Sequence, residues 1–64
     1  MHMRKKLLKT MEEQGYNVNK VSCLLGIKRS NIFSHVKGRS SLGFAKAKKI
    51  ADFLNIPLED VYAD

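Results

Sequence analysis

The sequence predicts an all-α protein: a compact five-helix bundle in which the second and third helices form a helix-turn-helix unit. Apolar residues recur at helical spacing in several separate stretches. The connections between these stretches are short and marked by glycine or proline. The segment Leu25-Gly26-Ile27 leaves room for a turn of only a few residues, and Gly26 can adopt the left-handed conformation that follows a helix end. Two short helices joined by such a link form a helix-turn-helix unit.

The first predicted helix covers residues 4–14 and ends at Gly15. Its inward positions, at helical spacing, are Met3, Leu7 and Met11, with Leu8 beside them. Its first half carries four cations: Arg4, Lys5, Lys6 and Lys9. Cations near a helix N-terminus oppose the helix dipole by some tenths of a kcal/mol, so local stability does not explain them. Attraction to phosphate and a solvated charged face are both open explanations.

The second predicted helix begins after Asn17, a residue type that caps helix N-termini well. Its inward stripe consists of Val18, Val21 and Leu25. Leu24 has no obvious place: it either packs on a neighbouring helix or is exposed.

The third predicted helix runs from about Arg29 to Lys37, after a weak side-chain cap at Lys28, and ends at Gly38. At roughly 100° per residue, its inner arc holds Ile32, His35 and Val36. Its outer arc of about 140° holds Arg29, Ser30, Phe33, Ser34 and Lys37. The outer arc contains no acid, which is unusual for a helix face that is only solvated.

The fourth predicted helix covers residues 42–55, with an inner stripe of Phe44, Ala47, Ile50, Ala51 and Leu54. Pro57 opens a short fifth helix over residues 58–62, because proline is favoured in a first turn. Glu59 and Asp60 lie near its N-terminus, where the helix dipole favours negative charge.

The length of 64 residues indicates a single domain over residues 1–64, whose small core is marginal on its own. We expect Met3 to be the natural first residue and His2 a cloning remnant. The one cysteine, Cys23, excludes an internal disulfide framework, and no partner with metal-ligand spacing accompanies it. No apolar run approaches the ~20 residues needed to span a bilayer, and no signal peptide is visible. We therefore expect a cytoplasmic protein.

The charge is strongly asymmetric along the chain. The net charge is +6, and residues 17–49 contain eight basic residues and no acid. Four of the six acids lie from Asp52 onward. This pattern favours one face that binds a polyanion and another kept away from it, against the plainer alternative of a basic solvated surface. The sequence offers no nucleophile–base pair, carboxylate dyad or metal cluster, so we expect neither an enzyme nor a cofactor or metal.

The pattern V-x-x-L-L-G-I-x-x-S-x-I-x-x-x-x-x-G-R, from Val21 to Arg39, resembles the core motif of the Cro/phage-repressor family of helix-turn-helix DNA-binding domains, which have the lambda-repressor-like fold. The later A-K-K-I-A-D-F-L-N-I-P-L-E-D-V-Y resembles the fourth and fifth helices of that family. The resemblance implies that the third helix lies in the DNA major groove. It implies base contacts from Arg29, Ser30, Phe33 and Ser34. It implies backbone contacts from Asn17, Asn19, Lys20, Lys28, Lys37, Gly38, Arg39 and Ser40.

Three positions depart from the family pattern. Val18 stands where the family often has a glutamine that reaches a phosphate. His35 stands where a large apolar residue is usual, and we expect a semi-buried packing residue rather than a DNA contact or pH sensor. Met11 and Val36 stand where many members pair arginine with glutamate, and we predict that their side chains touch.

The expected function is sequence-specific binding of double-stranded DNA as a transcriptional regulator, most simply a Cro-like repressor of a phage or mobile element. A homodimer, formed in solution or only on DNA, would cover a palindromic operator. Its interface is expected at Pro57, Leu58, Val61 and Tyr62, unless these residues only cap the core. The chain has no room for a domain that binds a small-molecule ligand. The alternatives are a protein-interaction module, such as an antitoxin or anti-repressor, and an RNA-binding domain.

Overall fold

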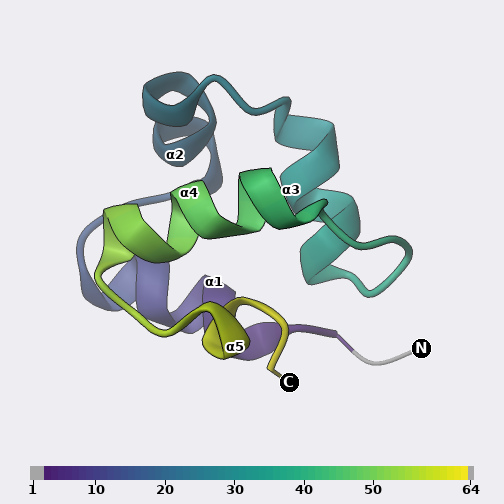
Figure 1. Ribbon diagram of the computed structural model, residues 1–64. Helices are drawn as coiled ribbons and strands as arrows, with labels where there is room; N and C mark the ends of the chain where they lie inside the picture. The colour runs from purple at the N-terminus through teal and green to yellow at the C-terminus, as the bar shows by residue number, and fades with distance from the viewer. Residues whose placement is uncertain (1–2, 64) are drawn as a thin grey trace.

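The computed structural model describes residues 3–63 and places five helices and no strand within them. The helices are α1 (Lys5–Glu13), α2 (Val18–Leu25), α3 (Arg29–Val36), α4 (Phe44–Leu54) and α5 (Leu58–Val61) (Figure 1). This confirms the predicted all-α five-helix fold. Most ends agree with the prediction to within a residue, and α4 begins two residues later than expected. The expectation about His2 lies outside the described residues.

The connection between α2 and α3 has the predicted geometry. Asn17 Oδ1 accepts a hydrogen bond from the Lys20 amide at 2.8 Å and so caps α2. Gly26 ends α2 in the left-handed region at φ 67°, where a side chain would be strained. The Ser22 hydroxyl donates to the Ile27 carbonyl across the turn. The hydrogen bond from Ser22 and the burial of Ile27 therefore both fix the turn after Gly26.

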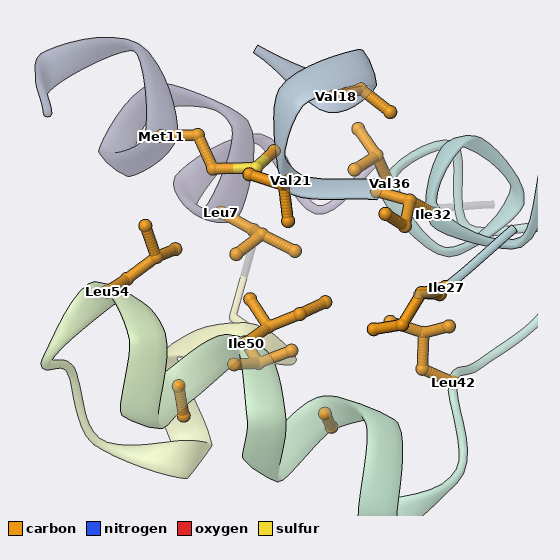
Figure 2. Packing of buried hydrophobic residues seen from close by; sticks show 13 residues of the cluster. Leu7, Met11, Val18, Val21, Ile27, Ile32, Val36, Leu42, Ile50 and Leu54 are labelled. Carbon is orange, nitrogen blue, oxygen red and sulfur yellow. The ribbon is translucent and has the colours of Figure 1, made fainter. Parts of the chain in front are cut away.

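The core lies between the five helices and gathers the apolar stripe of each. Figure 2 shows Leu7 and Met11 of α1 facing Ile50 and Leu54 of α4 across it. The buried apolar residues are Leu7, Met11, Val18, Val21, Ile27, Ile32, Val36, Leu42, Ala47, Ile50, Ala51, Leu54 and Val61. Met11 and Val36 both belong to this cluster, and their direct contact stays a prediction.

Two residues expected in the core lie outside it. Met3 is 44% exposed and Phe44 is 65% exposed. Phe44 is the first residue of α4, after an extended Gly43. Leu42, which precedes Gly43, lies in the core instead and is only 6% exposed. Leu24, for which the sequence left two possibilities, is exposed.

Arg4 joins the start of the chain to the end of α3. Its Nη1 donates to the carbonyls of His35 at 2.7 Å and Ser40 at 2.8 Å, and its Nη2 donates to Ser41 Oγ at 2.8 Å. Its amide also donates to the Val36 carbonyl at 2.6 Å. The last carbonyls of a helix lack partners within it and attract cations. The Arg4 charge is therefore explained by the end of α3, and neither explanation left open for it by the sequence is needed.

His35 is buried completely rather than partly, and both of its ring nitrogens are used. Nδ1 accepts from the Leu42 amide at 3.1 Å, and Nε2 lies 2.7 Å from the Val61 carbonyl. Because an amide can only donate, Nε2 must carry the ring proton and donate to Val61. The Tyr62 ring meets the imidazole edge to face at 5.3 Å. His35 thus connects α3, the loop before α4, and α5.

Candidate nucleic-acid interface

A shallow groove of about 620 Å³ runs along the outer side of α3. Its lining residues are Lys28, Arg29, Ser30, Phe33, Ser34, Lys37 and Arg39. The set includes all four residues expected to contact bases and three of those expected to contact the backbone. Four of the seven are cationic and none is acidic, so the groove suits a polyanion.

The groove is open because α3 divides its residues sharply between two sides. Ile32, His35 and Val36 are at most 3% exposed and fix the inner side of α3 in the core. Arg29, Ser30 and Phe33 are exposed on the opposite side, and Ser34 is half-buried. The predicted inner and outer arcs of this helix are confirmed.

Arg29 and Phe33 each have a neighbour that restrains them. Arg29 Nη1 donates to Asn19 Oδ1 of α2 at 3.0 Å. Lys37 Nζ lies 5.9 Å from the centre of the Phe33 ring, within cation–π range. Phe33 also lines a second, smaller hollow with Leu8, Glu12, Asn17, Val18 and Asn19. This hollow contains an acid, Glu12, so the acid-free surface ends there.

Apart from Lys28, which lines the groove at the start of α3, the residues expected to contact the DNA backbone form two groups. Asn17, Asn19 and Lys20 lie at the start of α2 and are exposed. The oxygen of Asn17 accepts the cap hydrogen bond, and its NH2 group is the side-chain donor that can reach an anion. Lys20 Nζ lies 5.5 Å from the centre of the Tyr16 ring.

The second group follows α3. Gly38 has φ 79°, a conformation that glycine adopts without strain. The amides of Gly38, Arg39 and Ser40 already donate to carbonyls of α3. Contacts from this loop to phosphate are therefore expected from the side chains of Lys37, Arg39 and Ser40.

The C-terminal surface differs from the sequence expectation at one residue. Val61 is 0% exposed, because α5 packs it against α1 and α4. It therefore has no side-chain area to offer a partner. Pro57 and Tyr62 are exposed and Leu58 is half-buried, so these three stay the predicted interface.

Sequence reasoning missed two features of the site: the support that Arg4 gives to the end of α3, and the hydrogen bond between Asn19 and Arg29. Both join residues on different elements, so no local spacing signals them. The only sequence signal for the bond between Asn19 and Arg29 is that Asn19 is a polar residue in the first turn of α2, beside the start of α3.

An exposed α3 flanked by cations and held outward in a helix-turn-helix has the geometry of a DNA-binding domain. The chain belongs to the family described as the Cro/C1-type HTH DNA-binding domain, which it matches over residues 6–64, and this membership makes it a DNA-binding regulator. It matches no curated protein and no solved structure at a significant level. Within residues 3–63, no helix has the length and apolar character needed to cross a bilayer. The same residues contain no cluster of side chains that could hold a metal ion.

Proposed function

We propose that this protein is a sequence-specific transcriptional repressor of a phage or mobile element, which binds a palindromic operator as a dimer and blocks polymerase by occupancy. The observation that carries the proposal is the α3 groove, with four cations and no acid around Phe33 and two serines. Lysine and arginine supply affinity for phosphates, and the mixed polar and aromatic residues between them supply contacts to base edges. Such a repressor acts in the cytoplasm.

In this proposal α3 enters the major groove and Arg29 bonds a guanine through two parallel hydrogen bonds, a contact that discriminates by ~1–3 kcal/mol. Phe33, which lies one turn of α3 after Arg29, meets the methyl group of a thymine. Ser30 and Ser34 are short and serve a base, a phosphate or a bridging water. Side chains at the start of α2 and after α3 hold the flanking phosphates.

The proposed dimer places two α3 helices in successive major grooves, about 34 Å apart. Pro57, Leu58 and Tyr62 provide apolar area at the end of the chain, where the acids concentrate. A two-fold axis there keeps both basic faces free for DNA. Control of the repressor comes from its concentration or from a partner protein.

Random-site selection with the wild-type protein and with Arg29→Ala tests the proposal. A palindromic motif that loses one guanine preference in the variant supports the class, the symmetry and the role of Arg29 together. Affinity should also fall by orders of magnitude between low and physiological salt, since about six phosphates are contacted. A protein that selects no duplex motif, or whose binding is indifferent to salt, would refute the proposal and favour a protein-interaction module.

A further inference from the structure

The hydrogen bond between Asn19 and Arg29 joins the two helices at the edge of the α3 groove. Asn19 lies in the first turn of α2, and Arg29 is the first residue of α3. Both are exposed, and Arg29 Nη1 donates to Asn19 Oδ1 at 3.0 Å. An exposed arginine is otherwise free to adopt many rotamers and loses that freedom when it binds. The Asn19 carboxamide therefore restricts Arg29 before any ligand arrives.

The atom that donates decides which part of Arg29 remains for a base. A guanidinium is a planar group with five N–H donors in a fixed arrangement. With Nη1 turned toward Asn19, the edge formed by Nε–H and Nη2–H is presented elsewhere. That edge carries two parallel donors, which match the O6 and N7 acceptors of guanine.

We propose that Asn19 is a positioning residue that sets the guanine preference of Arg29, instead of acting only as a contact to the DNA backbone. The proposal rests on the proposed function, because it assigns Asn19 a part in base reading by Arg29. The carbonyl oxygen of Asn19 holds Nη1, while its NH2 group stays available to a phosphate. Its two ends therefore contribute to specificity and to affinity separately.

The two contributions separate in the variants Asn19→Ala and Asn19→Asp. Alanine removes both the acceptor and the donor. Aspartate keeps an acceptor for Arg29 but removes the NH2 group and adds a negative charge near the phosphates. Both residues are tolerated in a first helical turn, alanine for its propensity and aspartate for its charge.

The experiment measures Kd for the selected operator and for duplexes in which the guanine read by Arg29 is replaced by each other base. Asn19→Ala should lower the preference for guanine by about threefold to tenfold, the usual value of one exposed hydrogen bond. Asn19→Asp should keep the preference while overall affinity falls. Cys23→Ala, at an exposed site further along α2, is the matched control and should change neither quantity.

In Arg29→Ala, the additional change Asn19→Ala should leave base preference unaltered, because the residue that it positions is gone. If Asn19→Ala weakens binding equally for all four bases while Arg29→Ala removes the guanine preference, Asn19 is a backbone contact and the inference is overturned. If the wild type selects no duplex at all, the proposed function has failed instead. Circular dichroism of each variant separates these results from loss of folding.

Discussion

Acidification should destabilise this protein through His35, and the structure fixes the direction of the effect. Burial lowers the pKa of His35 from its ordinary value near 6.5, the positive charge of Arg4 adds to the lowering, and the Val61 carbonyl opposes it. A second ring proton must go to Nδ1, which already accepts from the Leu42 amide. Protonation therefore sets two donors against each other inside the core and breaks the link between α3 and the loop before α4.

The magnitude follows from the difference in pKa between the unfolded and folded protein. As pH falls below about 6.5, the unfolded chain takes up a proton that the folded chain refuses, so the free energy of unfolding decreases. The upper limit is about 1.4 kcal/mol per pH unit, and the loss ends at the folded pKa. Most carboxylates titrate below about pH 5. The window between pH 6.5 and 5.5 therefore reports mainly on imidazole, and in a domain this small 1.4 kcal/mol is a large share of its stability.

Urea unfolding at pH 7.5, 6.5 and 5.5 measures the effect, in a His2→Ala background that removes the second histidine from the readout. The free energy of unfolding should change little between pH 7.5 and 6.5 and then fall. His35→Leu, which places an apolar side chain in the same space, should flatten this dependence. It should also lower stability at every pH, because the Leu42 amide and the Val61 carbonyl lose a buried partner, at about 1–3 kcal/mol each.

A direct titration of the His35 ring by NMR covers the case in which the leucine variant does not fold. A pKa at or above 6.5, or a wild-type stability that is flat from pH 7.5 to 5.5, would show that the reasoning about His35 is wrong.

Three further predictions concern the turn, the N-terminal arginine and the basic groove. Gly26→Ala should cost about 1 kcal/mol in urea unfolding, because φ is 67° although an added Cβ meets no atom within 4 Å. Gly43→Ala, at an ordinary φ, should cost less, because only the preference of a helix N-cap for glycine over alanine acts there. Equal losses in the two variants would contradict the role given to the left-handed φ of Gly26. Arg4→Ala should lower the free energy of unfolding by about 2 kcal/mol, because charged hydrogen bonds that are partly exposed are lost. The control Lys5→Ala should change the free energy of unfolding by less than about 0.5 kcal/mol. A similar loss in both variants would mean that the positive charge of α1, and not the Arg4 contacts, stabilises the fold. Arg39→Ala should reduce the slope of log affinity against log salt by about one. The side chain of Lys48 pairs with Asp52 at 3.3 Å, so Lys48→Ala should leave this slope unchanged. A reduced slope in Lys48→Ala alone would place the DNA on another face of the protein.

The helices of this fold could be read from the sequence because their signals are local. The cap at Asn17, the left-handed Gly26 and the stripe through Ile50 and Leu54 each depend on residues within one or two turns. Phe44 was misplaced by the same logic: the helical spacing extended the stripe past the point where the helix begins. Periodicity tells which residues share a face, but it does not tell where that face leaves the core.

The candidate site divides in the same way. The outer arc of α3 follows from its period, so the groove residues could be named in advance. The contacts that hold α3 in place could not be named, because Arg4 bonds side-chain and carbonyl atoms 31 to 37 residues away and His35 bonds Val61, 26 residues away. Val61 was placed on the surface for a related reason. In a helix of four residues, the pattern is too short to tell an inward apolar residue from an outward one.

The position of α3 depends on contacts outside the helix itself. It has eight residues, no side-chain N-cap and few apolar positions, so its own sequence stabilises it weakly. Asn19 bonds its first residue, Arg4 bonds carbonyls at and beyond its end, and His35 ties its inner side to α5. Base reading requires side chains held to within a fraction of an ångström. Substitutions at these three supports should therefore alter DNA recognition even where their own atoms touch no base.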